Sequence, residues 1–162
     1  PIAHLSALPL FAKMIKENNW NDGKTVLVSP DSGGIRRIKL ISEMLTYMPF
    51  ASIVKNRDLS TGKVTVGQIS GKILPRAIIV DDMISSGGTI AIAAKLLKKN
   101  GAKEIFVFAT HPVFSGKFKK ILQKAPVKKV FVADTIDIPR EKRFPKLEIL
   151  SVAKMLVDEL RG

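Results

Sequence analysis

Short apolar runs alternate with amphipathic segments along most of this chain. The runs at residues 26–28 and 78–80 are apolar at every position, like strands of a parallel sheet that is covered on both faces. Between such runs, apolar residues recur three and four positions apart, which is typical of helices that pack one face against a sheet. The pattern therefore predicts an α/β fold, with a doubly wound, mainly parallel sheet and helices on both faces.

The same pattern predicts the order of the elements. Helices are predicted at residues 8–17, 34–48, 89–100, 117–123 and 152–160. Strands are predicted at residues 25–29, 50–55, 63–68, 77–81, 104–109, 129–133 and 147–150. Residues 137–146 combine prolines with charges and are predicted to form a surface loop. Since no linker or internal repeat divides the sequence, we expect residues 1–162 to form one domain.

Composition excludes several classes of protein. The 162 residues are 46% hydrophobic and 25% charged, which suits one folded domain. No apolar run reaches the roughly 18 residues of a membrane-spanning helix, and no segment resembles a signal peptide. We therefore expect a cytoplasmic protein without a membrane partner. The chain has no cysteine, which excludes disulfides, thiolate metal sites and a cysteine nucleophile.

The chain is strongly basic, with 27 Lys and Arg against 14 acidic residues and a formal charge of +13. Its lysines are spread along helices and loops, with only short clusters such as Lys98-Lys99 and Lys128-Lys129. This distribution indicates a solvated lysine surface or phosphorylated small molecules as ligands. The hypothesis of a nucleic-acid-binding protein would rest on net charge alone, so no nucleic acid is expected as a partner.

One loop offers groups for a phosphate and a sugar together. The strand at 77–81 ends at two acids, and a helix opens eight residues later, after Asp81-Asp82-Met83-Ile84-Ser85-Ser86-Gly87-Gly88-Thr89. A helix N-terminus has unpaired N–H groups, glycines let a phosphate approach the backbone, and hydroxyls add further partners. The two acids can accept hydrogen bonds from sugar hydroxyls or hold a cation. The alternative is a plain turn and helix cap, in which the acid pair has no role.

Two further segments lie at predicted strand ends. Ser-Pro-Asp-Ser-Gly-Gly at residues 29–34 is, taken alone, also compatible with a Pro-Asp turn and a helix cap. Arg36 and Arg37 follow it, either as anion contacts or as surface charges. Lys55 and Arg57 are two positions apart in an extended segment, so they can reach one anion together. A solvated hairpin end is the alternative for that segment.

Together these motifs resemble one family. Residues 80–89 resemble the phosphoribosyl-diphosphate motif of type I phosphoribosyltransferases and, with Met83, are most similar to the version in ribose-phosphate diphosphokinases. That family commonly has Asp-Thr-Gly-Gly-Thr where this chain has Ser-Ser-Gly-Gly-Thr at 85–89. Residues 29–34 are similar to the family's Ser-Pro-Asp-x-Gly-Gly loop, and residues 55–57 to its Lys-x-Arg loop. Residues 109–116 resemble its Ala-Thr-His-Gly-x-Phe-Ser-Gly segment, with Pro112 in place of glycine.

The resemblance covers essentially the whole chain and implies a type I phosphoribosyltransferase-like fold. Family members are longer, and this chain resembles their C-terminal half. The implied reaction transfers the diphosphoryl group of ATP to the 1-hydroxyl of ribose 5-phosphate, with Mg²⁺ as cofactor. The implied partners are ATP, ribose 5-phosphate and further copies of the protein in a homo-oligomer. Residues 1–20 and 150–162 would pack with the half that is missing.

The resemblance also implies a role for each motif residue. Lys55 and Arg57 would be catalytic, and Asp31 would help to bind Mg²⁺. The diphosphate would lie along the loop that contains Ser32, Gly33 and Gly34. Ribose 5-phosphate would contact Arg57, Asp81, Asp82, Ser85, Ser86, Gly87, Gly88 and Thr89.

Two alternatives of other kinds stay open at this point. A nucleobase phosphoribosyltransferase would bind phosphoribosyl diphosphate and a base, but it gives no account of Lys55 and Arg57. A non-catalytic, synthetase-associated regulatory protein would retain the fold as a ligand sensor. The serine at position 85, in place of the family's acid, favours this second alternative, whereas the intact Lys55 and Arg57 oppose it.

Overall fold

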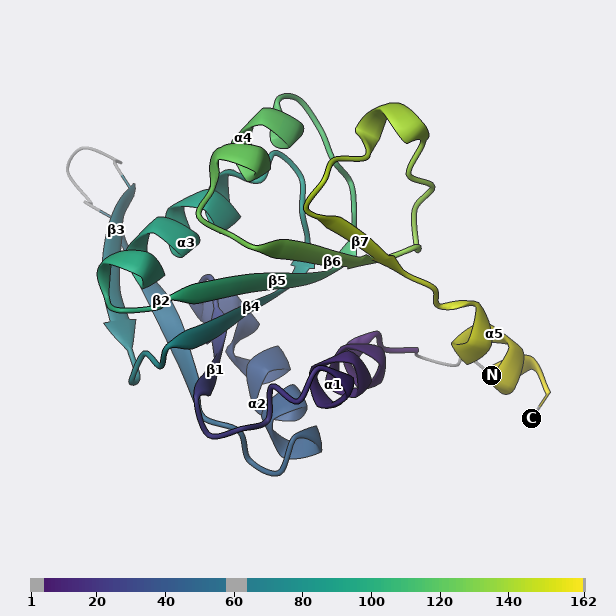
Figure 1. Cartoon of the computed structure of the whole chain (residues 1–162), viewed down its shortest axis with the longest axis horizontal. Coiled ribbons are helices and arrows are strands. Elements are labelled where there is room, and N and C mark those ends of the chain that lie inside the picture. The colour runs from purple at the N-terminus through teal and green to yellow at the C-terminus, as the bar shows by residue number, and fades with distance from the viewer. Residues whose placement is uncertain (1–4, 58–63, 162) are drawn as a thin grey trace.

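The computed structural model describes residues 5–57 and 64–161 (Figure 1). Its helices are α1 (Leu8–Glu17), α2 (Ile35–Met44), α3 (Gly88–Lys99), α4 (Phe118–Lys124) and α5 (Ala153–Leu160). Its strands are β1 (Thr25–Ser29), β2 (Phe50–Arg57), β3 (Val64–Ser70), β4 (Arg76–Met83), β5 (Glu104–His111), β6 (Lys129–Ala133) and β7 (Leu147–Leu150). Short 3₁₀ turns occur at η1 (Ser32–Gly34) and η2 (Arg140–Lys142).

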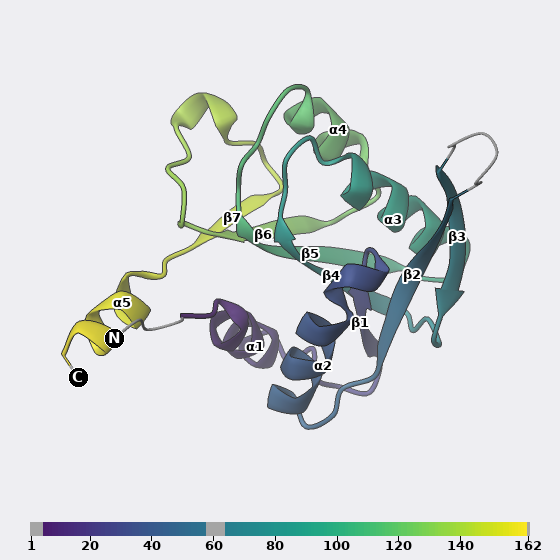
Figure 2. The same ribbon diagram turned by 180° about the vertical axis from the view of Figure 1, so that it is seen from behind.

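The seven strands form one sheet in the order β3-β2-β1-β4-β5-β6-β7. Only β3 runs antiparallel to its neighbour, and every other pairing is parallel. Helices α1 and α2 cover one face of the sheet and α3 and α4 the other, as both ribbon views show (Figures 1 and 2). The predicted doubly wound, mainly parallel sheet is therefore confirmed.

Two hydrophobic clusters, one on each face, hold the helices to the sheet. Because alternate strand residues point to opposite faces, Ile78 and Val80 of β4 pack toward α1 and α2, whereas Ile79 packs toward α3. On the α1 side, Phe108 stacks on Phe131 with ring centroids 4.5 Å apart. The central strands are thus buried on both sides, which explains their uninterrupted apolar sequences.

The second helix is shorter than the predicted 34–48. It begins with a 3₁₀ turn and ends at Met44, after which Thr46 and Tyr47 adopt left-handed backbone angles with φ of 59° and 58°. The Ser42 hydroxyl donates to the Met48 carbonyl oxygen at 2.6 Å, which closes this turn. The turn buries Leu45 and Met48 against the sheet, so core packing ends the helix before its apolar pattern does.

The stretch at 137–146 is more than the predicted surface loop. It contains η2, and its two apolar residues, Ile138 and Phe144, are 2% and 6% exposed. Both belong to the hydrophobic cluster on the α3 and α4 side of the sheet. The loop is therefore anchored to the core at two points, which its proline and charge content does not reveal.

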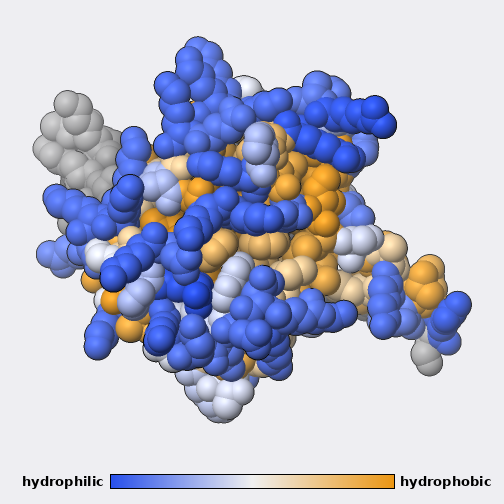
Figure 3. Space-filling view, viewed as in Figure 1, coloured by the Kyte–Doolittle hydropathy of each residue, from blue (hydrophilic) through white to orange (hydrophobic). Residues whose placement is uncertain are grey.

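Helix α5 projects past β7, away from the sheet (Figure 1). None of its residues is buried, and Leu156, Val157 and Leu160 are 48%, 41% and 87% exposed. In the space-filling view, apolar side chains gather in a band between the two helical layers, and a smaller apolar group lies on α5 (Figure 3). Each helix that the structure describes is too short or too polar to cross a bilayer.

Candidate functional site

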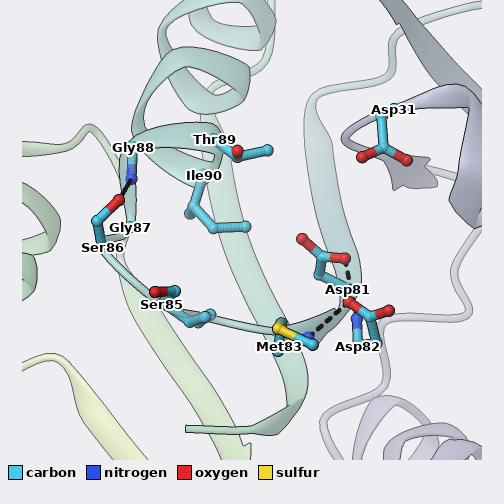
Figure 4. A pocket seen from close by; sticks show the side chains of 11 residues that line it. Asp31, Asp81, Asp82, Met83, Ser85, Ser86, Gly87, Gly88, Thr89 and Ile90 are labelled. Carbon is cyan, nitrogen blue, oxygen red and sulfur yellow. Dashed lines mark hydrogen bonds between the residues drawn. The ribbon is translucent and has the colours of Figure 1, made fainter. Parts of the chain in front are cut away.

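The loops that follow β1 and β4 meet at one edge of the sheet, because these strands are parallel neighbours. They enclose a pocket of about 200 Å³, smaller than the roughly 300–1,000 Å³ of sites for drug-sized ligands. Figure 4 shows the carboxylates of Asp31 and Asp81 across this pocket from Ser86 and Gly88. The lining residues are Asp31, Asp81, Asp82, Met83, Ile84, Ser85, Ser86, Gly87, Gly88, Thr89 and Ile90.

The structure thus brings together most of the predicted phosphate and sugar residues with the predicted metal ligand. Ser32, Gly33 and Gly34 are not part of this lining. Gly33 instead lines a groove beside the pocket, and Gly34 is the buried last residue of the η1 turn. The predicted diphosphate loop therefore flanks the pocket.

The loop after β4 is held by the segment between β5 and α4. The Ile84 N–H donates to the His111 carbonyl at 3.0 Å, and the Phe114 N–H donates to the Ile84 carbonyl at 2.9 Å. Phe114 is 2% exposed, so its side chain anchors this segment in the core. The Ser85 hydroxyl lies 2.8 Å from that of Ser115. Ser85, the position that departs from the resembled motif, therefore forms a hydrogen bond between two loops.

Two glycines shape the start of α3. Gly87 has φ of 78°, and an added Cβ there would lie 3.0 Å from the Leu122 side chain. Gly88 has no positive φ, and the nearest atom to an added Cβ is the Ser86 hydroxyl at 3.5 Å. Gly87 cannot cap the helix with a side chain, and Gly88, Thr89 and Ile90 of the first turn line the pocket. Backbone N–H groups and the helix dipole there favour an anion.

The acid pair lies at the end of β4, which continues past the predicted boundary at Asp81 to Met83. Arg37 of α2 contacts both acids, with Nη1 3.4 Å from Asp81 Oδ1 and Nη2 3.0 Å from Asp82 Oδ2. The backbone N–H of Asp82 also donates to Asp81 Oδ1 at 2.9 Å. The sequence left open whether Arg37 contacts an anion or is a surface charge. In the structure its guanidinium contacts both carboxylates of the acid pair.

The two acids differ in their affinity for protons. Burial raises the pKa of Asp81 to about 6, and the nearby Asp82 carboxylate contributes to the rise. For Asp82 burial acts in the same direction, but the Arg37 guanidinium and the hydrogen bonds from Asp81 and Met83 outweigh it and lower the pKa. Near pH 6 the pair therefore holds one fixed negative charge on Asp82 and one exchangeable proton on Asp81.

Asp31 combines the two alternatives that the sequence left open. Its Oδ1 accepts a hydrogen bond from the Gly34 N–H at 3.2 Å, which is the expected helix cap, yet the residue also lines the pocket. The Ser29 hydroxyl donates to the Asp31 carbonyl at 2.6 Å and fixes the turn. In the described ranges, no three His, Asp or Glu side chains gather as a metal cage. A single carboxylate with ligand phosphates is a common way to hold Mg²⁺.

Lys55 and Arg57 belong to β2, which extends two residues beyond the predicted end at position 55. They are paired in register with Val66 and Val64 of β3, and the register shifts between Ile53 and Lys55. Such irregularities bend a strand and are common beside active sites. The side chains of Lys55 and Arg57 lie outside the described part of the structure, as does the loop at 58–63, so their predicted roles stay predictions.

A hydrogen-bonded pair that sequence reasoning missed lies beside the pocket. The Thr135 hydroxyl donates to the Thr110 carbonyl at 2.9 Å, and His111 Nδ1 lies 2.9 Å from the same hydroxyl oxygen. Because the hydroxyl proton is already donated, Nδ1 of His111 must carry the ring proton in this pairing, which leaves Nε2 as the acceptor of the neutral ring. In the sequence, Thr110 and His111 stood out only as part of the segment 109–116. Nothing near them in the sequence indicates Thr135 as their partner.

The two glycines provide a matched test of the loop. We expect Gly87→Ala to lower the stability of the chain by about 1–3 kcal/mol, because it combines a left-handed φ with a close contact to Leu122. Gly88→Ala should leave stability within about 1 kcal/mol of the wild type, because the added Cβ meets only ordinary contacts. Urea unfolding of both variants measures the difference, and equal losses would contradict the role assigned to Gly87.

The raised pKa of Asp81 gives a second prediction. An acid with a raised pKa in the folded chain keeps its proton longer there than in the unfolded chain. Its contribution to stability is therefore full below about pH 3.8 and is lost as the pH rises through about 6. We expect one carboxyl resonance with a midpoint near pH 6 in ¹³C NMR titrations, absent in Asp81→Asn and shifted to lower pH in Asp82→Asn. A midpoint near 4 for Asp81 would contradict this assignment.

Comparisons with known proteins agree with the geometry. A family model described as the phosphoribosyl synthetase-associated domain matches residues 22–162. The ribose-phosphate pyrophosphokinase of Clostridium acetobutylicum is 38% identical over 99% of this chain and 50% of its own length. That of Mycobacterium leprae is 37% identical over 100% of this chain and 50% of its own length. The chain spans about half the length of the curated relatives it matches.

Solved structures confirm the expected fold. The phosphoribosylpyrophosphate synthetase from Mycobacterium smegmatis has a TM-score of 0.89 and 36% identity, covering 99% of this chain and 51% of its own. A purine phosphoribosyltransferase from Pyrococcus horikoshii has a TM-score of 0.52 at 18% identity, covering 90% of this chain and 84% of its own. An orotate phosphoribosyltransferase from Aeropyrum pernix reaches 0.56 at 17% identity, with 96% and 74% covered. Because their identity to this chain is low, the last two structures show the fold alone.

The chain belongs to the family of the phosphoribosyl synthetase-associated domain and has a type I phosphoribosyltransferase-like fold.

Proposed function

We propose that this chain forms the ribose 5-phosphate side of an enzyme that transfers the diphosphoryl group of ATP to the 1-hydroxyl of ribose 5-phosphate. The products are phosphoribosyl diphosphate and AMP. The observation that carries this proposal is the pocket itself, where a helix N-terminus suited to a phosphate lies across from two carboxylates suited to sugar hydroxyls. The relatives' name, ribose-phosphate pyrophosphokinase, supports the same reaction.

In this proposal the 5-phosphate binds at the start of α3. Its oxygens accept hydrogen bonds from the backbone N–H groups of the loop and from the hydroxyls of Ser86 and Thr89, which are exposed. Gly87 and Gly88 allow that approach. Ser85 contributes less than the other hydroxyls, because its oxygen is already paired with Ser115.

The sugar hydroxyls bind at the end of β4. Asp82, held ionised by Arg37, accepts hydrogen bonds only, whereas Asp81 can accept or donate near pH 6. Mg²⁺ fits Asp31, whose carboxylate is a hard oxygen ligand at the pocket wall. When bound, the ion would neutralise phosphate charge.

The transfer needs alignment and charge neutralisation more than covalent chemistry. The 1-hydroxyl oxygen of the sugar attacks the β-phosphorus in line and loses its proton. The bond between the β-phosphorus and the oxygen bridging to the α-phosphorus breaks, and AMP leaves with that oxygen. Lys55 and Arg57 stabilise the charge on the moving phosphates, and the Arg57 guanidinium also contacts ribose 5-phosphate. The diphosphate passes along the loop of Ser32, Gly33 and Gly34.

The rest of the enzyme lies outside this chain. Since the chain spans half the length of its relatives, we propose that the other half supplies most of the adenine site. Residues 1–20 and 150–162 would contact that half, which agrees with the unburied helix α5. The full protein would be a homo-oligomer in the cytoplasm.

Calorimetry with ribose 5-phosphate in magnesium buffer tests the phosphate site. We expect saturable binding, and ribose as control should bind at least about 100-fold more weakly, a difference of about 2.7 kcal/mol. Gly88→Ala, for which we expect an intact fold, should also weaken the binding of ribose 5-phosphate, because its Cβ occupies the path by which the phosphate approaches the backbone. Equal affinity for both sugars, or binding of neither, would contradict the proposed site.

Lys55→Ala tests the catalytic step in the protein that carries this chain. We expect release of AMP from ATP and ribose 5-phosphate to fall by about 10²–10³-fold, because one charge on the transition state is lost. Ribose 5-phosphate affinity should change little. Lys98→Ala, an exposed lysine at the far end of α3, is the control. Unchanged turnover in Lys55→Ala would refute the catalytic role and favour a regulatory protein.

A further inference from the structure

The pocket has an unexpected charge for a site that receives phosphates. Its described lining contains Asp31, Asp81 and Asp82 but no lysine or arginine. The adjacent carboxylates of Asp81 and Asp82 repel an anionic sugar phosphate unless cations offset their charge. The distant lysines that contribute to the net charge of +13 have little effect on these two acids, because solvent and salt screen their charge.

Arg37 is placed to offset that charge from behind the lining. Its two Nη atoms reach different acids, 3.4 Å to Asp81 Oδ1 and 3.0 Å to Asp82 Oδ2. The Arg37 side chain is 21% exposed and that of Asp81 15%, so solvent screens this contact less than it screens a surface pair. The planar guanidinium fork fixes the orientation of both carboxylates at once, which a single ammonium group cannot do.

The loop after β1 makes room for this arginine. A Cβ added to Gly34 would lie 3.1 Å from Arg37 Nη1 and 2.4 Å from the Ser29 hydroxyl. A side chain at position 34 would therefore displace the guanidinium or open the turn that Ser29 closes on the Asp31 carbonyl. Gly34 thus matters for the acid pair as well as for its own loop.

Arg36, the adjacent residue, differs from Arg37 in its exposure and in its ion pairs. Its side chain is exposed, whereas that of Arg37 is half-buried, although both arginines border the groove beside the pocket. None of the ion pairs found in the described ranges involves Arg36. The two arginines therefore form a natural matched pair, in which only one charge is coupled to the acids.

We propose that Arg37 is a positioning residue for the sugar-phosphate site. It holds Asp81 and Asp82 in the orientation that meets the sugar hydroxyls and reduces the negative charge that an entering phosphate meets. The identity of the ligand rests on the function proposed above, whereas the coupling between Arg37 and the acids does not. Arg37 is not part of the pocket lining, and its ion pairs are with Asp81 and Asp82, so it acts through the acids.

The first test is calorimetry with ribose 5-phosphate on four proteins. Relative to the wild type, Arg37→Gln should weaken binding by at least about tenfold, or 1.4 kcal/mol. The affinity of Arg37→Lys should lie between those of the wild type and Arg37→Gln, since lysine keeps the positive charge but lacks the planar guanidinium fork. Arg36→Gln should stay within about threefold of the wild type. Thermal unfolding of each variant shows whether a loss reflects the site or the fold.

The second test needs no ligand. In ¹³C NMR titrations, Arg37→Gln should raise the midpoint of the Asp82 carboxyl, because the guanidinium that holds it ionised is gone, and Arg36→Gln should leave it unchanged. An unchanged Asp82 midpoint in Arg37→Gln would overturn the proposal, as would wild-type affinity for ribose 5-phosphate in that variant. If the wild type binds no ribose 5-phosphate, the proposed function fails, and the carboxyl titration still decides the role of Arg37.

Discussion

The candidate site depends on the parallel pairing of β1 with β4. From these two neighbours the strand order runs outward in opposite directions, so the helices that follow them cover opposite faces of the sheet. The loops at their carboxyl ends diverge and leave an opening, which is where open α/β sheets bind ligands. The register of Leu27 with Ile78 then brings Asp31 and Asp81 together in the lining of that opening, across from Ser86 and Gly88.

Each end of the pocket is supported by a different distant segment. The phosphate end is fixed by the loop after β5, through the hydrogen bonds of Ile84 with His111 and Phe114 and through the buried Phe114 ring. The acid end is fixed by Arg37 from α2. Because one support belongs to each face of the sheet, the pocket is formed only when both layers have packed. Its shape is thus a product of the whole domain.

The sequence alone determined the architecture. The predicted bounds of α1, β1, β6 and β7 are those of the structure, because Pro9 in the first turn of α1 and breaks in the apolar pattern mark these ends locally. Where burial decided instead, the prediction failed. The helix predicted to reach residue 48 ends at Met44, since Leu45 and Met48 enter the core on a turn. The charged stretch after β6 is anchored by Ile138 and Phe144, which charge and proline content do not indicate.

In the candidate site, the sequence alone determined the groups that are close together along the chain, namely the acids at 81–82 and the loop at 85–89. It could do so because the strand end, the glycine turn and the helix start follow one another directly. Only the tertiary structure decided their partners. Arg37 is 44 positions from Asp81, Ser115 is 30 from Ser85, and Thr135 is 24 from His111. Side chains that far apart meet only through the pairing of strands and the packing of helices, which also determine the burial and the neighbours that shift the pKa values of the acids.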